Sequence, residues 1–408
     1  MASGALRNTS KLGLSSLKWP RTMFPQSRAF SAHLTETQCA VQDMTRKFTE
    51  EYLKPKAGQL DLNGRFPFEP IKKLTDLGLM GATASEDNGG MGLDYLSLAV
   101  AIEELSRGCA STGMILAIHN FLYVNLVNER GTYEQKERFL NNFTNGGRIG
   151  CFALSEPEAG SDVANIKTTA TSDGDYWVLN GKKSWVTSGV EGSATVVFAT
   201  CDPALRHKGL ACFLVPLDAE GVFRGKKESL MGVRASTACD LTLAEVRIPK
   251  NNLVGEVGEG FRIAMAQLDQ ARVGIAAHAV GIAQAALDTA INYAKERVAF
   301  GKCLTRLPSV KDRLTDMCIL IESARLLTYR AATQVSTKNS AMAKYVAGKN
   351  AALVADHCVQ ILGGRGLSTN YPAERHYRDA RGTQIYGGVT DIQKRLVGHY
   401  LLKENDAL

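Results

Sequence analysis

A glycine turn near the C-terminus has the residue types and the spacing that could do chemistry. Residues 378–395 read RDARGTQIYGGVTDIQKR. Gly387 and Gly388 allow a positive φ and a close approach of the backbone to a ligand. Thr390 and Gln393 have the spacing of a capping box that opens the last helix. Backbone N–H groups at such a helix start suit a phosphate or a developing oxyanion, although an ordinary helix–turn–helix joint would show the same pattern.

Two stretches in the middle of the chain could hold a flat heteroaromatic ring. Residues 151–162 (CFALSEPEAGSD) offer an apolar wall, a hydroxyl and a glycine turn, and residues 185–189 (WVTSG) offer an aromatic side chain and a hydroxyl for the other edge of the ring. Asn180-Gly181 predicts a β-hairpin whose return strand carries the second stretch. Each stretch alone is also typical of plain β-core.

Three helical stretches are further candidates. In residues 268–272 (LDQAR), Asp269 and Arg272 share a helix face, which favours a simple ion pair. In residues 296–302 (ERVAFGK), Arg297 could complement the helix dipole or meet a pyrophosphate. Residues 360–366 (QILGGRG) are typical of a glycine C-cap, and they would also allow a nucleotide to approach the backbone.

The elements that must position these residues follow from hydrophobic periodicity. Three- and four-residue spacing predicts helices over 36–53, 70–77, 96–105 and 112–127. Short apolar runs separated by turn signals predict strands over 151–154, 177–179, 194–199, 211–215 and 241–246. Longer helices are predicted over 261–298, 309–334, 340–362 and 391–403. The fold class is therefore mainly α with a central β-domain: a helical domain (34–148), a β-barrel-like domain (149–250) and a four-helix bundle (251–408).

The N-terminus has the composition of a mitochondrial transit peptide. The first 35 residues contain five Lys or Arg, several Ser and Thr, and no Asp or Glu. A disordered basic tail is the alternative. Removing residues 1–33 subtracts five from the formal net charge of +7 and leaves +2. A nearly neutral mature chain gives no reason to expect nucleic acid as a partner.

Composition and motifs exclude several classes of protein. The 408 residues are 45% hydrophobic, enough for a large core, and no run approaches the roughly 18 apolar residues that span a bilayer. Nine cysteines without a Cys-x-x-Cys pair indicate reduced core thiols, not disulfides or a zinc site. The sequence has no Rossmann fingerprint, Walker A motif, His-x-x-x-His pair or G-x-S-x-G elbow, so it predicts no dinucleotide fold, ATP site, metal or serine hydrolase.

Five separated motifs together resemble the acyl-CoA dehydrogenase family, and its short-chain branch most. They are residues 150–162 (GCFALSEPEAGSD), 177–187 (WVLNGKKSWVT), 294–301 (AKERVAFG), 360–366 (QILGGRG) and 372–381 (PAERHYRDAR). The resemblance implies a homotetrameric FAD enzyme of the mitochondrial matrix. Such an enzyme oxidises the Cα–Cβ bond of a short acyl-CoA in fatty-acid β-oxidation and passes electrons to electron-transferring flavoprotein.

Matching positions carry over the expected contacts. The resemblance implies that the FAD contacts are Phe152, Leu154, Ser155, Gly160, Ser161, Trp185, Val186, Thr187, Arg297, Phe300, Gln360, Gly363, Gly364, Val389, Thr390 and Asp391, with 360–364 reaching a neighbouring subunit. It implies that the substrate contacts are Ser161, Asp269, Gln270, Ala271, Arg272 and Gly388.

The catalytic base is where this chain departs from the family. The reaction removes an α-proton while a hydride leaves Cβ, so it needs a positioned carboxylate. Most of the family has Tyr-Glu-Gly-Thr, whereas this chain has Tyr386-Gly387-Gly388-Val389. Branches such as the isovaleryl-CoA dehydrogenases supply a Glu from the first long helix instead, and the matching residue here is Ala271. No catalytic residue is therefore identified.

A second departure concerns the cofactor. Relatives have Leu-Gln-x-x-Gln where this chain has Leu307-Pro308, and Pro308 lacks the amide that contacts FAD. We expect FAD and acyl-CoA to bind, with the backbone N–H of Gly387 polarising the thioester carbonyl, while dehydrogenation is slow or absent. The alternatives are a non-catalytic paralogue that acts as a partner subunit, and an oxidase or isomerase that uses the same flavin pocket.

Overall fold

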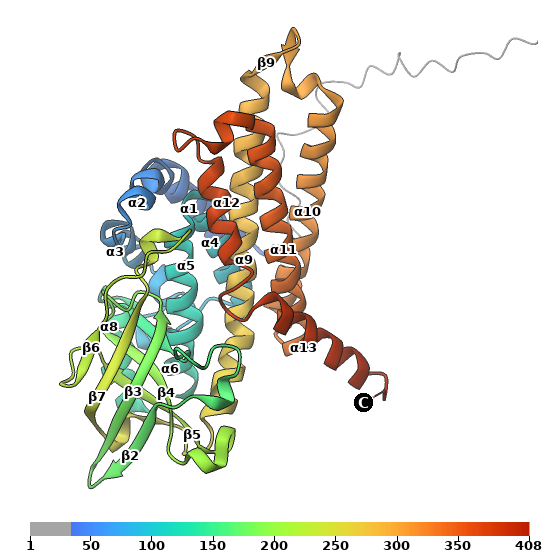
Figure 1. Ribbon diagram of the computed structural model, residues 1–408. Coiled ribbons are helices and arrows are strands. Elements are labelled where there is room, and N and C mark those ends of the chain that lie inside the picture. Colours follow the sequence, from blue (N-terminus) through green and yellow to red (C-terminus); the bar gives the residue numbers. More distant parts are fainter. Residues whose placement is uncertain (1–33, 408) are drawn as a thin grey trace, which may run out of the picture. The chain divides into compact units, whose positions relative to one another are not determined.

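The computed structural model describes residues 34–407, so the transit peptide predicted for residues 1–33 lies outside the described residues. Thr35–Leu408 forms one unit, to which all the elements below belong. Figure 1 shows these elements coloured along the chain.

Short helices form the first part of this unit. They are α1 (Glu36–Phe48), α2 (Ala57–Asn63), α3 (Phe68–Asp76), α4 (Tyr95–Gly108), α5 (Ala110–Ile118), α6 (Asn125–Arg130), α7 (Tyr133–Phe139) and α8 (Asn141–Thr144). A π-helical turn, His119–Val124, joins α5 to α6 in one continuous buried helix. The four helices predicted in this region are confirmed, with small shifts at their ends.

The middle of the chain is an eight-stranded sheet. Its strands are β1 (Gly150–Ala153), β2 (Thr169–Asp173), β3 (Tyr176–Val186), β4 (Ala194–Thr200), β5 (Leu210–Pro216), β6 (Val222–Arg224), β7 (Cys239–Pro249) and β8 (Leu253–Val254). The order is β6-β7-β3-β2-β4-β5-β8, with β1 parallel to β4. Alternate residues of β4 enter two different cores, since Val196 and Phe198 pack toward the helices while Val197 packs within the β-domain.

The hairpin predicted at Asn180-Gly181 is wrong. Strand β3 runs straight through this dipeptide, and its pairing with β7 shifts register between Leu179 and Gly181. A Cβ at Gly181 would lie 2.5 Å from Thr168 Oγ1, so the glycine marks a bulge where two backbones approach closely. The hairpin lies earlier, at the turn between β2 and β3 that contains Gly174.

Long helices form the last part of the unit. They are α9 (Gly260–Glu296), α10 (Pro308–Thr333), α11 (Thr337–Leu362), α12 (Ala373–Gly382) and α13 (Thr390–Lys403), with a short β9 (Val298–Ala299) and β10 (Lys302–Cys303) between α9 and α10. In Figure 1, α9, α10 and α11 run side by side, and α12 packs on α9 and α11. The sequence predicted residues 391–403 as the fourth helix of the bundle. This helix, α13, packs on α11, whereas α12 packs on both α9 and α11 and is therefore the fourth helix of the bundle.

Two helical stretches are long and apolar enough to cross a bilayer by length and composition alone. They are Ala110–Arg130 and Gly260–Glu296, which pass on mean hydropathy although neither is an unbroken apolar run. Their apolar windows are 94% and 78% buried inside the fold. Both are therefore core helices of this unit.

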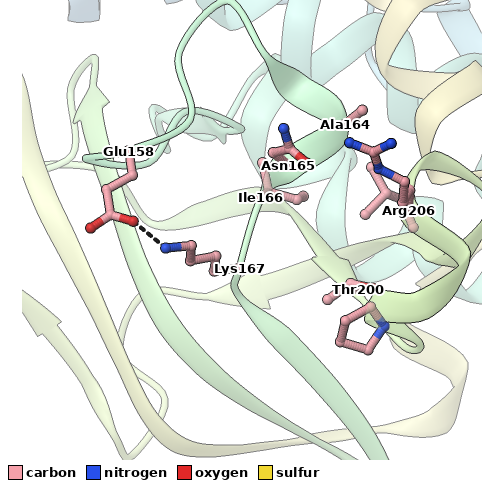
Figure 2. A pocket seen from close by; sticks show the side chains of 9 residues that line it. Glu158, Ala164, Asn165, Ile166, Lys167, Thr200 and Arg206 are labelled. Carbon is pink, nitrogen blue, oxygen red and sulfur yellow. Dashed lines mark hydrogen bonds and ion pairs between the residues drawn. The ribbon is translucent and has the colours of Figure 1, made fainter.

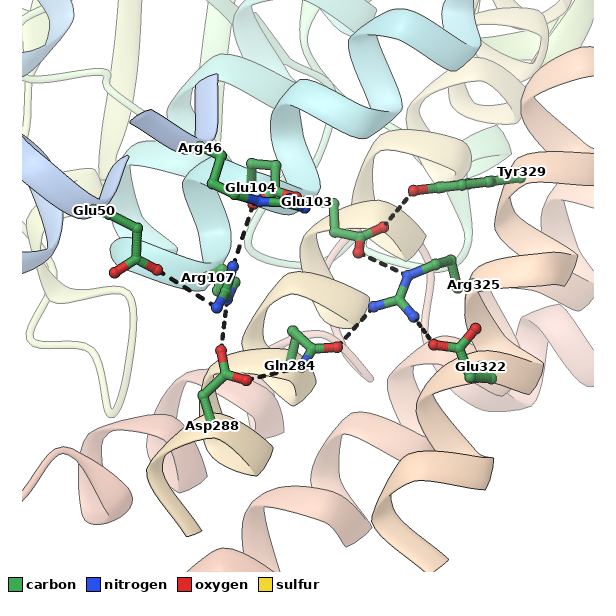
Figure 3. Close-up of polar contacts among 10 residues, drawn as sticks. All are labelled: Arg46, Glu50, Glu103, Glu104, Arg107, Gln284, Asp288, Glu322, Arg325 and Tyr329. Carbon is green, nitrogen blue, oxygen red and sulfur yellow. Dashed lines mark hydrogen bonds and ion pairs between the residues drawn. The ribbon is translucent and has the colours of Figure 1, made fainter. Parts of the chain in front are cut away.

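A network of charged groups ties α4 to the bundle (Figure 3). Arg325 of α10 donates to Glu103 of α4 over 2.8 Å and to Gln284 of α9 over 2.9 Å. Arg107 of α4 donates to Asp288 of α9 over 2.6 Å. Loss of one partner would leave a buried charge uncompensated, so the network fixes the N-terminal helices against α9 and α10.

Candidate active site

The predicted glycine turn lies between α12 and α13. Gly387 has φ +68° and Gly388 has φ +95°, which confirms that these positions need glycine conformations. Among residues 34–407, no acceptor takes a hydrogen bond from the Gly387 N–H. The turn thus presents a backbone donor to a ligand.

The capping box predicted for α13 is wrong. Thr390 is the first residue of α13 and not its N-cap, and its Oγ1 donates to the Gln384 carbonyl over 3.0 Å. The Gln393 side chain reaches back to the turn, where Nε2 donates to the Gly388 carbonyl over 3.1 Å. The side chains of Thr390 and Gln393 thus donate hydrogen bonds to carbonyls that precede α13, and they do not cap the N–H groups of α13.

The space beside Gly387 faces α9. A Cβ at Gly387 would lie 3.1 Å from Ile275 Cγ1, and the next nearest atoms, at 3.8 and 4.0 Å, also belong to Ile275. Ala271 lies one turn earlier on α9 and, like Ile275, is buried. The two positions that the resemblance implies for the base therefore lie near one another, and neither supplies a carboxylate.

Lys344 lies behind the turn, on α11. It is 1% exposed, and its Nζ donates to the Gly388 carbonyl. Burial, together with the positive charge of Arg272, lowers the pKa of Lys344 to about 7. This lysine was not a candidate from the sequence, because a lysine within a helix usually lies in solvent.

Asp269 and Arg272 form the intrahelical ion pair that their spacing predicts. The pair is not on the surface, since Arg272 is 5% exposed and Asp269 also accepts from Thr337 of α11 over 2.6 Å. Burial raises the pKa of Asp269 and lowers that of Arg272. Gln270 points elsewhere and donates to Glu129 over 3.1 Å.

Tyr386 is held by a chain of hydroxyl and imidazole groups. His278 Nε2 lies 2.9 Å from Tyr386 Oη, and His278 Nδ1 lies 2.9 Å from Ser106 Oγ of α4. Burial lowers the pKa of His278 to about 3, so its imidazole stays neutral and bridges the two hydroxyls. Burial raises the pKa of Tyr386 well above its usual value, so the phenol keeps its proton.

The structure brings together the two stretches that were predicted to hold a ring. Ser184 N–H donates to the Ser155 carbonyl over 2.8 Å, and Cys151 Sγ donates to the Ser188 carbonyl over 3.4 Å. Trp185 has φ +62° and its side chain is 61% exposed, so its indole is available to a ligand. The other candidates here lie on β1, on the loop after it, or at the end of β3. They are Phe152, Leu154, Gly160, Ser161, Val186 and Thr187.

A buried ion pair locks these stretches. Lys183 Nζ donates to Glu156 Oε1 over 2.7 Å and to the Leu154 carbonyl over 3.2 Å. Burial would raise the pKa of Glu156, but the charge of Lys183 and hydrogen bonds from Lys167 and Thr168 lower it overall. Glu156 and Lys183 stand within the recognised motifs, but sequence reasoning gave them no role.

The remaining candidates lie at the other end of the bundle. Arg297 follows the last residue of α9, Phe300 is 90% exposed, and Gly363 caps α11 with φ +60°. Gln360 and Gly364 are exposed beside it. From Ala271 to the end of α9 is about 25 residues, or roughly 38 Å at 1.5 Å per residue. One chain therefore holds two separated groups of candidate residues.

Two hollows lie near candidate residues. One, of about 430 Å³, is beside the glycine turn and is lined by Val389, Thr390 and Asp391 with the cations Lys349, Arg381 and Lys394. The other, of about 470 Å³, is in the β-domain (Figure 2), with the ion pair of Glu158 and Lys167 on one side and Arg206 on the other. Of the stretch 151–162 that was predicted to hold a ring, Glu158 alone lines this second hollow.

Comparisons with known proteins cover most of the described unit. Residues 35–147, 151–246 and 258–402 match the N-terminal, middle and C-terminal domains of acyl-CoA dehydrogenase. The chain is 48% identical over 392 residues to the short-chain specific acyl-CoA dehydrogenase, mitochondrial, of Sus scrofa, covering 94% of this chain and 95% of that protein.

Solved structures agree with these matches. The butyryl-CoA dehydrogenase of Megasphaera elsdenii superposes with a TM-score of 0.89 at 38% identity, covering 91% of this chain and 100% of that one. A structure described as PigA with FAD and proline superposes with a TM-score of 0.87 at 26% identity, covering 91% and 99%.

Proposed function

This chain belongs to the acyl-CoA dehydrogenase family, and from that premise we propose that it binds FAD and a short acyl-CoA but abstracts the α-proton slowly. It is an oxidoreductase by family. One observation carries the proposal: the Gly387 backbone N–H has no acceptor within the described residues 34–407, and neither Gly387 nor Ala271 supplies a carboxylate.

The residues of this chain fit FAD. The exposed indole of Trp185 and the half-buried ring of Phe152 provide faces for the isoalloxazine, and Ser155 and Thr187 provide hydroxyls. When bound, FAD supplies the hydride acceptor of a dehydrogenation. The cations lining the hollow beside Val389–Asp391 suit its phosphates. The similar PigA structure, which is described with FAD, supports this assignment.

The chain itself binds and polarises the substrate. The Gly387 N–H donates to the thioester carbonyl, which stabilises negative charge as the α-proton leaves. Tyr386 is fixed by His278 and Ser106, and Lys344 and Gln393 hold the Gly388 carbonyl, so the turn is preorganised. What is missing is a group that takes the proton, and loss of a general base costs roughly 10²–10⁴ in rate.

Anaerobic titration with butyryl-CoA tests this proposal. We expect binding to perturb the flavin absorption band at about 450 nm without bleaching it rapidly. Restoring a base with Gly387→Glu should raise the bleaching rate by roughly 10²–10⁴, and Gly387→Gln, of the same size without a base, should not. Rapid bleaching by the natural chain at an ordinary turnover rate would contradict the proposal.

Ala271→Glu is a second test that avoids backbone strain. A glutamate at 387 would have φ +68°, which disfavours an L-residue by roughly 1–2 kcal/mol, and Ile275 must move by a few tenths of an ångström. Position 271 is helical and carries no such cost. If both glutamate variants stay inactive while FAD and butyryl-CoA bind, the missing base does not explain the slow dehydrogenation.

Assembly and context complete the proposal. The two groups of candidate residues lie roughly 38 Å apart along α9, so a complete FAD site needs a neighbouring copy, and the homotetramer expected from the family supplies one. We place the protein in the mitochondrial matrix, with electron-transferring flavoprotein as the acceptor. The mitochondrial relative supports the compartment.

The absence of glutamate at both positions also favours a second function. A chain that binds acyl-CoA and FAD without turnover could serve as a partner subunit of an active paralogue. Purification of the native complex distinguishes the two, because a partner subunit would co-purify with a glutamate-bearing chain.

A further inference from the structure

A side chain at Gly387 would begin 3.1 Å from Ile275 Cγ1, a contact that is relieved when Ile275 moves by a few tenths of an ångström. Apart from its own chain neighbours, only Ile275 has atoms within 4 Å of the position of a Cβ at Gly387. On the side of Gly388, the Gln393 amide is close and buried, and its Oε1 has no hydrogen-bond partner among the described residues. A small group could therefore enter beside Gly387.

The charge next to this space is unbalanced. Lys344 Nζ donates a hydrogen bond to the Gly388 carbonyl. Because consecutive Cα atoms are 3.8 Å apart, Nζ lies no more than about 9 Å from the Gly387 Cα. Arg272 is neutralised by Asp269, whereas no carboxylate within residues 34–407 pairs with Lys344. The resemblance implies a glutamate at this point of the turn, and this chain has Gly387 there, without a negative charge.

Two buried polar atoms without partners among residues 34–407 lie on the helices that carry Ile275 and Lys344. Arg272 Nε and Ser340 Oγ are buried and have no hydrogen-bond partner among the described residues. Ser340 stands one turn before Lys344 on α11 and three residues after Thr337, which contacts Asp269. The face of α11 that meets α9 thus offers donors in addition to the lysine.

We propose that this site takes a carboxylate from a ligand, beside Gly387 and attracted by Lys344, in place of the missing glutamate. This inference rests on the proposed function. The carboxylate could belong to a small free acid such as formate, or to the acyl group of a dicarboxylic acyl-CoA. In either case the C–H bond at Cα breaks, an O–H bond forms on the carboxylate, and the electron pair stays on the substrate as a thioester enolate.

Exchange of the α-protons in D₂O tests the free-acid source. The full-length protein with its bound flavin is incubated with butyryl-CoA and increasing formate, with chloride keeping the ionic strength constant, and deuterium at Cα is followed by NMR. We expect exchange to rise saturably, by tenfold or more. No dependence on formate, or a dependence that never saturates, overturns this source.

Three variants separate the site from general effects. Lys344→Met should raise the formate concentration for half-saturation by tenfold or more, because it removes the attracting charge. Lys338→Met, on the same helix but paired with Glu404, should behave like the natural chain. Gly387→Glu should exchange without formate and show no response to it. An equal response of all variants overturns the proposal.

Glutaryl-CoA tests the carried carboxylate. If the acyl group brings its own base, glutaryl-CoA exchanges its α-protons without formate while butyryl-CoA does not. If neither formate nor glutaryl-CoA supports exchange, the inference fails. Equilibrium dialysis of butyryl-CoA keeps the two proposals apart: binding without exchange leaves the proposed function standing, and absence of binding overturns both.

Discussion

Lys344 is a lysine whose surroundings change what it does at neutral pH. It is buried behind the glycine turn, it has a carbonyl as its partner, and a second cation lies nearby. Sequence patterns could not find it, since burial of one lysine depends on how α11 meets α9 and α13. The ion pair of Asp269 and Arg272 could be predicted, because both residues stand on one helix at fixed spacing.

The stability of the protein should record the pKa of Lys344. That pKa is about 7 when folded and 10.5 when free, so between these values the unfolded chain binds one more proton. Stability therefore rises with pH in this window, by up to about 1.4 kcal/mol per pH unit from this residue. Urea unfolding at pH 7, 8 and 9 should show a smaller slope for Lys344→Met. Equal slopes would contradict the assignment.

Strand β3 shows what local patterns decide at the scale of an element and what they do not. Asn-Gly is a strong turn signal, yet β3 pairs with β7 on both sides of it, and this distant pairing turns Gly181 into a bulge. The sequence predicted the long helix α9, because the helical hydrophobic period repeats over many turns within one segment. The start of α13 was misplaced by one residue for the same reason as the hairpin: contacts of Thr390 and Gln393 with the turn outweigh a local motif.

Two glycine substitutions test the bulge. In Gly181→Ala, the new Cβ would lie 2.5 Å from Thr168 Oγ1 with φ +153°, so the free energy of unfolding should fall by about 2–4 kcal/mol. Gly174→Ala, in the hairpin turn with φ +55° and open space around it, should cost about 1 kcal/mol. Urea unfolding measures both, and equal losses would argue against a close backbone approach at Gly181.

At the scale of the whole unit, neutral histidines are buried in several parts of the core. Burial lowers the pKa of His278 and His376 to about 3 and that of His119 to about 4. Each contributes stability above the free pKa of 6.5 and loses it as pH falls toward the folded value. Asp379 opposes them by one proton, since burial raises its pKa to about 6.

Acid should therefore destabilise the protein from about pH 6 downward. Between pH 6 and 4, the three histidines take up about three protons when the chain unfolds, and Asp379 releases about one. The net uptake of about two protons lowers the free energy of unfolding by roughly 3 kcal/mol for each pH unit of acidification. Urea unfolding across this range gives the slope. A flat profile would mean that these histidines are charged in the folded state. A chain with His278→Gln should lose about one third of the histidine contribution.

The length of α9 ties the cofactor to the amount of protein present. The glycine turn lies against the interior of this helix at Ile275, and the C-terminal end of the helix leads to the exposed Phe300. If the FAD site is shared between copies, each chain contributes residues to two FAD sites and completes neither of them alone. Loading then follows mass action between subunits: dilution that separates the copies also opens the cofactor site, and flavin retained on dilution stabilises the assembly by the same free energy.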